Sequence, residues 1–341
     1  MIIMDSTGQI MGRSYGTGTN PWTTSWMLID KDELVFATML IGRDECVDKI
    51  KELSDECKRN AGLSQDQQLQ ILGMSISGTE SQSTQDEIIG KLHDRYPNLS
   101  KSYYMCNDTF GSLATGFEAG IVLISGTGSN CLLINSDGTT RNCGGWGHQL
   151  GDHGGGYWIA HKAITTIYYH WDNFELSKHD IGKVEKLLRE YFHVEDKNDI
   201  LPHFYTKFEK GFVAKFCTAL AEVANTGDPL ACEIFKEAGY TLGRHVAAVS
   251  PFIEKPLLEQ ENGVAILCVG SVWKGWNLLK AGFLQGIHST TDSQRLIKKF
   301  QLATLKESCA VGAAILAVKD KKDQLVVDCS KNVDIFFKHT F

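Results

Sequence analysis

The sequence predicts an α/β fold organised as two lobes. Apolar, β-branched runs typical of strands alternate with segments whose apolar residues recur at helical spacing, an order that indicates a sheet with helical crossovers. The chain has 341 residues and is 43% hydrophobic, which is enough for two domain-sized cores. A hairpin followed by strand and helix alternation occurs in both halves. We therefore expect an N-terminal lobe at 1–118, a C-terminal lobe at 119–341 and a cleft between them.

The N-terminal lobe is expected to open with a hairpin and to continue with strand and helix units. Apolar residues recur at helical spacing between charged ones over 43–60, and Gly62 follows as a stop signal. Thr84 and Glu87 have the spacing of a capping box at the start of a second helix, which has to end before Pro97. The expected elements are strands at 1–4, 10–15, 69–76 and 103–106 and helices at 43–60 and 84–96.

The C-terminal lobe is expected to combine a sheet with a largely helical part. Asp228 followed by Pro229 is typical of a helix N-cap and first turn. Residues 264–269 are all apolar, as in a strand that is buried on both faces. The expected strands are 121–124, 131–135, 264–269 and 300–305, and the expected helices are 157–171, 182–193, 212–224, one starting at 229, 276–284 and 308–318.

The segment 124–130, Ile-Ser-Gly-Thr-Gly-Ser-Asn, follows an apolar strand with alternating glycine and hydroxyl residues. Gly126 and Gly128 allow a tight backbone turn in which successive N–H groups converge on an anion. The hydroxyl groups of Ser125, Thr127 and Ser129 add further donors. An ordinary hairpin turn between two strands explains the same residues. The pattern alone therefore leaves a phosphate loop and a plain hairpin turn both open.

Asp108 lies just past the expected strand at 103–106, where a carboxylate at the end of a strand can face a ligand crevice. There it could accept a proton from a substrate hydroxyl as a general base. Alternatively, Asp108 is the N-cap of a helix that begins at Thr109, because aspartate is a favoured cap. Four glycine-containing turns that follow strands could converge on one such crevice, namely 77–78, the turn after 107–108, 125–129 and 270–271.

Glycine dominates the segment 144–156. Because each glycine destabilises a helix or strand, so many of them indicate that this backbone closely approaches another group. Trp146 supplies an apolar face, and His148 and Asp152 supply polar groups. This is the mix expected of a pocket for a hydroxyl-rich ligand such as a sugar. A flexible surface loop carrying His148 and His153 remains an alternative. A metal site built from these residues is disfavoured, because their spacing matches no helical ligand pair.

Charge and composition narrow the class of partner. The formal net charge is −7 and basic residues are scattered singly, which argues against nucleic acid or a membrane surface as a partner and favours a small molecule. The 10 cysteines show no CxxC spacing, which indicates reduced thiols and a cytoplasmic protein. No apolar run approaches the roughly 18 residues that a membrane span needs.

Four motifs together resemble the N-acetylglucosamine kinases of the actin-like, hexokinase-like ATPase superfamily, from Leu40 to the C-terminus. They are Leu-Ile-Ser-Gly-Thr-Gly-Ser-Asn-Cys at 123–131, Cys-Gly-Gly-Trp-Gly-His at 143–148, Gly151-Asp152 before Tyr-Trp-Ile-Ala-His at 157–161, and Leu-Cys-Val-Gly-Ser-Val-Trp-Lys at 267–274. The resemblance implies two ribonuclease-H-like lobes, a homodimer, and Mg²⁺-dependent transfer of the γ-phosphate of ATP to the 6-hydroxyl of N-acetylglucosamine.

The resemblance also implies roles for individual residues. Asp108 takes the place of the general base that accepts the proton of the sugar hydroxyl. The positions that match nucleotide contacts are Thr127, Gly128, Ala214, Gly270 and Ser271. The positions that match sugar contacts are Asn20, Asp108, Ser129, Asn130, Gly145, Trp146, Gly147 and Asp152. No residue is assigned as a protein ligand to a metal.

The chain departs from the family pattern in three places. Gly-Asp-His-Gly-Gly at 151–155 stands where the family commonly has Gly-Asp-Glu-Gly-Ser, so an acidic residue near the sugar is lost. The first strand of the N-terminal lobe and its glycine-rich phosphate loop have no counterpart in the sequence. The segment 23–39, next to the sugar-contacting turn at Asn20, is equally without counterpart. We interpret the last two departures as a gene-model artefact in preference to a genuine insertion.

One alternative keeps the superfamily but changes the reaction to that of an activator ATPase or of a kinase for a different sugar. Because the first phosphate loop is missing, two further functions are open for the chain as given. One is an active N-acetylglucosamine kinase. The other is a catalytically silent sugar-binding or regulatory protein that keeps the pocket but cannot clamp ATP, because removing a single preorganised donor can cost about 2.7–4 kcal/mol of transition-state stabilisation.

Overall fold

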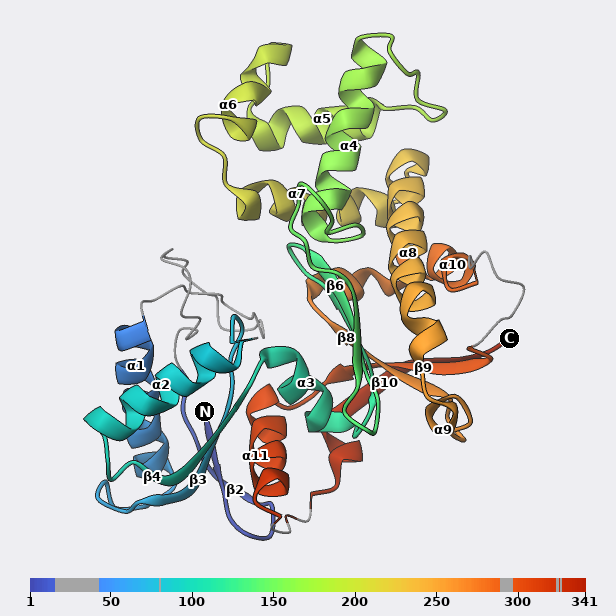
Figure 1. The fold of residues 1–341 in the computed structure, drawn as a ribbon. Helices are drawn as coiled ribbons and strands as arrows, with labels where there is room; N and C mark the ends of the chain where they lie inside the picture. The colour runs from blue at the N-terminus through green and yellow to red at the C-terminus, as the bar shows by residue number, and fades with distance from the viewer. Residues whose placement is uncertain (16–42, 80, 289–296, 323–324, 326) are drawn as a thin grey trace. The chain divides into compact units, whose positions relative to one another are not determined.

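The chain folds as a mixed α/β protein, as the sequence predicts (Figure 1). The computed structural model describes residues 1–15, 43–79, 81–288, 297–322, 325 and 327–341. These residues form two compact units, one made of Met1–Ala119 with Ala303–Phe336 and the other of Gly120–Leu302 with Phe337–Phe341. Residues 303–336, expected in the C-terminal lobe, thus belong to the unit that begins at Met1. Asn20 and the segment 23–39 lie outside the described residues.

The first unit contains two separate pairs of strands. Strands β1 (Ile2–Met4) and β2 (Ile10–Arg13) form the expected antiparallel hairpin. The Oδ1 atom of Asp5 closes its turn by accepting hydrogen bonds from the amides of Thr7 at 2.8 Å and Gln9 at 3.0 Å. Strands β3 (Leu69–Ser75) and β4 (Ser100–Cys106) pair in parallel, which requires the crossover that the intervening helix provides.

Four helices cover these strands: α1 (Arg43–Asn60), α2 (Gln82–Arg95), α3 (Asp108–Gly116) and α11 (Cys309–Asp320). Buried residues of α1, α2, β3 and β4 form one hydrophobic cluster, with Val47, Ile88 and Met74 among its members. The capping box expected at Thr84 is wrong. Ser81 is the N-cap of α2 because its side chain accepts the amide of Thr84, whereas Glu87 forms an ion pair with Arg43.

The second unit is built on a six-stranded sheet in the order β10-β9-β8-β5-β6-β7. Strand β8 is completely buried and runs parallel to β5, as expected of an all-apolar strand. Strands β7 and β10, which the sequence analysis did not predict, close the two edges of the sheet, and β9 and β10 also contribute residues to the first unit. The bounds are β5 (Gly120–Ser125), β6 (Ser129–Ile134), β7 (Thr140–Gly144), β8 (Val264–Val269), β9 (Lys299–Leu305) and β10 (Val333–Thr340).

Helices of the second unit pack closely through glycine. In the pair α8 and α10, a Cβ atom at Gly239 would lie 2.0 Å from the carbonyl oxygen of Leu279, and one at Gly282 would lie 1.8 Å from that of Lys236. Glycine on both helices thus allows their backbones to touch. The helices are α4 (Gly156–Trp171), α5 (Gly182–Phe192), α6 (Leu201–Phe204), α7 (Lys210–Asn225), α8 (Pro229–Val249), α9 (Lys255–Leu258) and α10 (Trp276–Gly286). Single 3₁₀ turns occur at Lys197–Ile200, Ser250–Phe252, Ser271–Gly275 and Cys329–Asn332.

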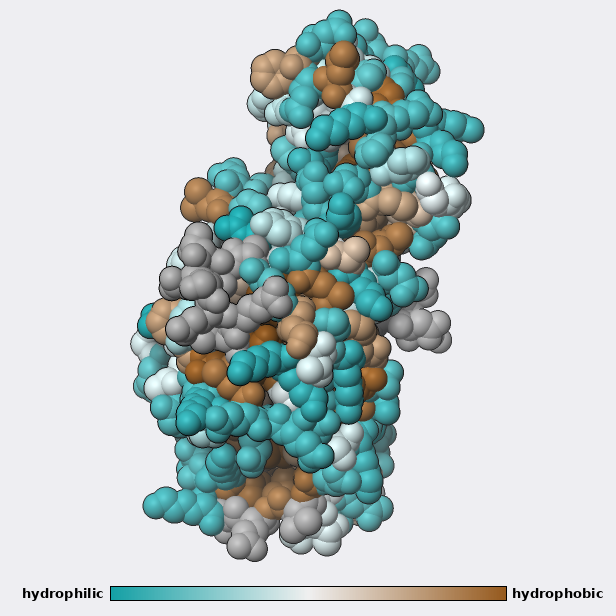
Figure 2. All heavy atoms as spheres, turned by 90° about the vertical axis from the view of Figure 1, so that its right-hand side faces the viewer, coloured by the Kyte–Doolittle hydropathy of each residue, from teal (hydrophilic) through white to brown (hydrophobic). Residues whose placement is uncertain are grey.

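The surface and the thiols have ordinary properties. The face shown in Figure 2 is mostly hydrophilic, with hydrophobic residues in scattered groups, as on most globular proteins. None of the helices in the described ranges combines the length and the hydropathy that crossing a membrane requires.

All cysteines are free thiols. Burial raises the pKa of Cys46, Cys106 and Cys217 to about 12, so these three thiols are poor nucleophiles.

Candidate active site

The turn at 125–129 joins β5 to β6, so the hairpin interpretation of this segment is confirmed. Ser125 pairs with Ser129 across the antiparallel ladder, and the amide of Gly126 donates to the carbonyl of Gly128 at 3.0 Å. Within the described part of the chain, the amides of Thr127 and Gly128 donate no hydrogen bond. Thr127 is exposed, so this hairpin turn presents two adjacent N–H groups to a ligand, as an anion-binding turn would.

The N-terminus of α4 lies against the same turn. The amides of Gly156 and Tyr157 donate to the carbonyls of Gly126 and Thr127 at 2.7 and 3.0 Å. These bonds satisfy two of the N–H groups that a helix start leaves without an intrahelical partner. They also hold the turn's carbonyls toward the helix, so the anion-binding potential of the turn lies in its amides.

The glycine segment 144–156 approaches this turn closely. A Cβ atom at Gly155 would lie 2.6 Å from the carbonyl carbon of Gly128, and a Cβ at Gly128 would lie 2.6 Å from Oδ2 of Asp152. The hydroxyl groups of Ser125 and Ser129 donate at 2.8 Å to the carbonyls of Gly154 and His153, respectively. These two hydroxyls are therefore used within the protein, and the expectation that both would serve as donors to an anion is corrected.

Asp152 is the polar centre of this contact. Its Oδ1 accepts the amide of Ser129 at 3.2 Å, and its Oδ2 lies 2.8 Å from Nζ of Lys210 at the start of α7. The Asp152 side chain is 6% exposed and that of Lys210 is 33% exposed. Asp152 has a φ of 58°, a left-handed conformation that aspartate adopts more readily than most residues. One carboxylate thus joins the turn, the glycine segment and α7.

The residues expected to contact sugar lie along the glycine segment and the start of β6. The side chain of Asn130 packs against Gly145, where an added Cβ would lie 3.0 Å from the Asn130 carboxamide, and its Oδ1 is buried without a hydrogen-bond partner among the described residues. Trp146 is 70% exposed. Gly147 has a φ of 80° and open space around it. A buried acceptor without a described partner and an exposed aromatic residue on the same short segment suit a hydroxyl-bearing ligand.

The residues expected to contact nucleotide lie near the turn as well. Gly270 has a φ of 109° and approaches Ser125 so closely that a Cβ atom would lie 2.3 Å from the Ser125 carbonyl oxygen. Ser271 is exposed and begins the 3₁₀ turn after β8. The carbonyl oxygen of Ala214 on α7 would lie 3.4 Å from a Cβ at Gly156. The structure thus brings together the segments of Thr127, Gly128, Ala214, Gly270 and Ser271.

The substitution Gly270→Ala tests this packing. With a φ of 109° and a ψ of 159°, Gly270 has a conformation that is essentially restricted to glycine, so alanine costs about 1–3 kcal/mol before its clash with Ser125 is counted. We expect a lower melting temperature and weakened nucleotide binding, measured by calorimetry. Gly275→Ala is the matched control, because the nearest atom to its Cβ lies 4.0 Å away. Equal effects of the two substitutions would contradict this account.

Asp108 belongs to the first unit, where it is the first residue of α3. The N-cap is Asn107, whose Oδ1 accepts the amide of Phe110 at 3.1 Å, so the alternative that Asp108 caps the helix is wrong. Asp108 is half-buried, and its Oδ1 accepts a long hydrogen bond of 3.4 Å from the hydroxyl of Thr109. The cap of α3 is thus supplied by Asn107 and not by the Asp108 carboxylate.

Sequence reasoning missed two side chains of the site. Lys210 pairs with Asp152, yet it lies 58 positions away and looks like any surface lysine in the sequence. His245 on α8 is buried with Nδ1 2.9 Å from the carbonyl of Thr241, and its Nε2 lies 3.0 Å from the position of a Cβ at Gly144. Burial lowers the pKa of His245, so its imidazole is neutral at pH 7. Among the residues with described positions, no group of three His, Cys, Asp or Glu side chains is placed to hold a metal ion.

Two curated relatives match part of the chain. An N-acetylmuramic acid/N-acetylglucosamine kinase of Clostridium acetobutylicum is 30% identical over 217 residues, which is 62% of this chain and 65% of the relative. An N-acetyl-D-glucosamine kinase of Dictyostelium discoideum is 26% identical over 234 residues, 65% of this chain and 67% of the relative. The match therefore spans slightly less than two thirds of the first relative's length.

Solved structures show the same fold. A candidate N-acetylglucosamine kinase from Chromobacterium violaceum has a TM-score of 0.58 at 18% identity, covering 81% of this chain and 86% of its own. One from Porphyromonas gingivalis has a TM-score of 0.57 at 17% identity, and the match covers 94% of this chain and 95% of that structure. The sequence profile of the BadF/BadG/BcrA/BcrD ATPase family matches residues 1–317. Because this profile matches residues 1–317, the chain belongs to the BadF/BadG/BcrA/BcrD ATPase family.

Proposed function

We propose that this protein is a sugar kinase that transfers the γ-phosphate of ATP to the 6-hydroxyl of N-acetylglucosamine. One observation carries the proposal: within four residues, 127–130, two backbone amides and a buried carboxamide oxygen have no hydrogen-bond partner among the residues that the structure describes. The amides suit a phosphate, and the Asn130 oxygen suits a sugar hydroxyl or an acetamido N–H. A phosphate site directly beside a polyol site is what a sugar kinase requires.

The proposed reaction gives each residue a defined task. The amides of Thr127 and Gly128 hold ATP phosphate oxygens, and Gly270, Ser271 and Ala214 border the nucleoside. The oxygen of the sugar 6-hydroxyl forms a bond to the γ-phosphorus while the bond to the β–γ bridging oxygen breaks and ADP leaves. The Asp108 carboxylate accepts the hydroxyl proton.

Mg²⁺ is assigned to the phosphates of ATP in this proposal. The ion commonly keeps several waters and binds through one or two carboxylates together with substrate phosphates. When bound, it neutralises charge that develops on the transferred group. Asn130, Gly145, Trp146, Gly147 and Asp152 form the proposed sugar-binding wall, to which Ser129 contributes its hydroxyl as an acceptor.

Partners and specificity follow from the same proposal. We propose that the partners are small molecules, that the protein acts in the cytoplasm and that it is a homodimer. A pocket built to hydrogen-bond an acetamido group rejects analogues that lack it. Comparing kcat/KM for N-acetylglucosamine, glucosamine and glucose therefore tests the acceptor, and equal values for the three sugars would contradict the proposed specificity.

The substitution Asn130→Ala separates binding from folding. The buried Asn130 oxygen has no hydrogen-bond partner in the described part of the chain, so we expect alanine to leave the melting temperature unchanged or raised. The KM for the sugar should rise about tenfold, the equivalent of one hydrogen bond of about 1.4 kcal/mol. Steady-state kinetics and thermal unfolding measure the two effects.

Asn135→Ala is the control for this experiment. The side-chain Nδ2 of Asn135 donates to the carbonyl of Phe252 at 2.9 Å and to Oγ1 of Thr139 at 3.0 Å. Loss of this side chain is therefore expected to destabilise the protein without changing the KM for the sugar. A lower melting temperature and an unchanged KM in Asn130→Ala would show that the Asn130 carboxamide is structural and would overturn its assigned role.

A further inference from the structure

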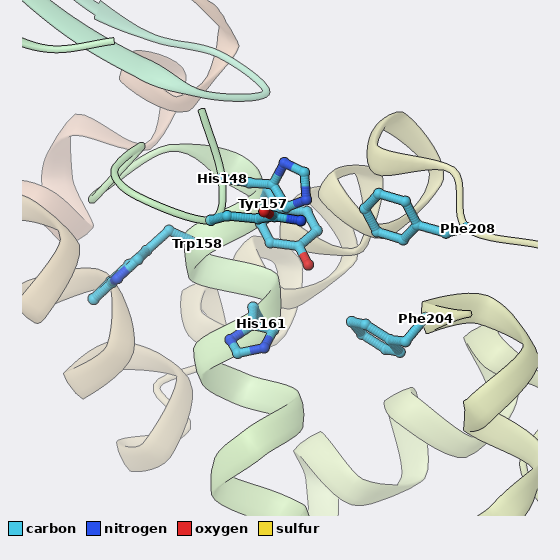
Figure 3. Close-up of a pocket in the computed structure, with 7 residues that line it drawn as sticks. His148, Tyr157, Trp158, His161, Phe204 and Phe208 are labelled. Atoms are coloured by element: carbon cyan, nitrogen blue, oxygen red, sulfur yellow. The ribbon is translucent and has the colours of Figure 1, made fainter. Parts of the chain in front are cut away.

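A cavity lies in the second unit, next to the glycine segment. It is built from the loop before α4, the first turns of α4, and the stretch from α6 to the start of α7 (Figure 3). Its volume is about 440 Å³, within the range of pockets that bind small molecules. The residues that line it are His148, Gln149, Tyr157, Trp158, His161, Phe204 and Phe208. None of them has a role in the proposed phosphoryl transfer.

Aromatic rings form two sides of this cavity. His148 stacks with Phe208 at a centroid distance of 5.2 Å and meets Tyr157 edge-on at 4.9 Å. On the other side, His161 meets Phe204 edge-on at 6.1 Å. Figure 3 shows His148, Tyr157 and Phe208 on one side, His161 and Phe204 on the other, and the Tyr157 hydroxyl directed into the space between them. Tyr157 and His161 stack at a centroid distance of 5.8 Å, so the two sides meet at these rings, and an aromatic lining of this kind suits packing against the face of a sugar ring.

The lining selects for an uncharged ligand. It contains no Asp, Glu, Lys or Arg side chain. Burial, and secondly the neighbouring His148, lower the pKa of His161, so this imidazole is neutral at pH 7. A phosphate group would find no lysine or arginine side chain in this lining. The Tyr157 hydroxyl, the Gln149 amide and the imidazole nitrogens instead offer hydrogen bonds to hydroxyl or amide groups at the edge of a ring.

The cavity adjoins the proposed sugar-binding wall through a short, ordered turn. The amides of Leu150 and Gly151 donate to the carbonyl of Gly147 at 3.3 and 2.8 Å, and this turn sets His148 and Gln149 directly after Trp146 and Gly147. A Cβ at Gly151 would lie 3.5 Å from the Cβ of Trp146, so the turn packs back onto the tryptophan. One loop therefore carries both the exposed Trp146 and two residues that line the cavity, His148 and Gln149.

We infer that this cavity is a second subsite for the acceptor, which holds the uncharged ring attached to the sugar that is phosphorylated. The inference rests on the proposed sugar kinase function and deepens it. The substrate class becomes N-acetylglucosamine glycosides with a neutral sugar ring at the anomeric carbon, of which the β-linked disaccharide N,N′-diacetylchitobiose is the simplest probe. The monosaccharide leaves the aromatic subsite empty.

The experiment compares N-acetylglucosamine with N,N′-diacetylchitobiose in the full chain and in Phe208→Ala. We expect both sugars to be phosphorylated, and the substitution to lower kcat/KM for the disaccharide about tenfold while changing that for the monosaccharide less than about twofold. Phe204→Ala, on the opposite wall, should act in the same direction. Phe174→Ala is the matched control, because Phe174 is 77% exposed and lies outside the cavity.

Two results would overturn the inference. One is phosphorylation of the monosaccharide but not of the disaccharide, and the other is an equal effect of Phe208→Ala on both sugars. If neither sugar is phosphorylated, the proposed function fails, and calorimetry then decides the subsite on its own. Disaccharide binding that is weakened by Phe208→Ala but not by Phe174→Ala supports it, whereas equal or absent binding rejects it.

Discussion

Replacing Asp108 by asparagine is expected to lower kcat by a factor of about 10²–10⁴ while leaving sugar affinity nearly unchanged, because the amide cannot accept the proton of the attacking hydroxyl. The fold should tolerate the change, since Asn107 rather than Asp108 caps α3. Loss of a negative charge from the first helical turn costs only about 0.3–1 kcal/mol. A coupled assay of ADP release gives kcat, and calorimetry gives sugar affinity.

Asp86→Asn is the matched control for this substitution. Asp86 is exposed on α2 in the same unit, so its replacement removes an equal charge without touching the proposed chemistry. A kcat that falls equally in both variants, or that stays unchanged in Asp108→Asn, would contradict the role of Asp108 as the general base.

The largest structural effect is expected from Asp152→Ala. The change removes the acceptor of the Ser129 amide and the partner of Lys210, and it places alanine at a φ of 58°. Breaking a buried ion pair costs about 3–5 kcal/mol, and we expect about 3 kcal/mol here because the Lys210 side chain is one-third exposed. For a unit of this size, that lowers the melting temperature by about 6–12 °C. Sugar and nucleotide binding should weaken together.

Three further variants separate the loss of charge from backbone strain. Asp152→Asn keeps a side chain that tolerates left-handed backbone and can still accept the Ser129 amide, so it should recover part of the stability that Asp152→Ala loses. Lys210→Met removes the partner of Asp152. Lys215→Met is its control for the loss of a positive charge, because Lys215 is an exposed residue of the same helix. We expect Lys210→Met to destabilise the protein far more than Lys215→Met does. Differential scanning calorimetry measures all four variants, and equal melting temperatures for the two lysine variants would contradict the importance of the ion pair.

The parts of the fold that sequence predicts well are those in which several local signals agree. Helix α1 occupies Arg43–Asn60 as expected, because apolar periodicity and the positive φ of Gly62 define the same boundary. Strand β7 was missed because its residues are mostly polar and exposed at a sheet edge, so no burial pattern marks it. Ser81 rather than Thr84 caps α2, since neighbouring hydroxyl residues compete for the same role and local sequence does not rank them.

In the candidate site too, the features with a local sequence signal could be predicted and those that depend on tertiary packing could not. The glycine-rich turns could be predicted from the sequence, because glycine is required where two backbones approach too closely for a Cβ atom. They did not show that the segment 144–156 approaches the hairpin turn itself, nor that the Ser125 and Ser129 hydroxyls are satisfied internally. The pairing of Asp152 with Lys210 and the burial of the Asn130 oxygen depend on tertiary packing, which leaves no local pattern in the chain.

ADP release from ATP and Mg²⁺ in the presence of N-acetylglucosamine, followed in a coupled assay on the purified chain, tests the central claim most directly. The proposed function predicts saturable ADP release that depends on the sugar, with one sugar phosphate formed for each ADP. Calorimetric binding of the sugar without any sugar-dependent ADP release would contradict it and would identify a silent sugar-binding protein instead.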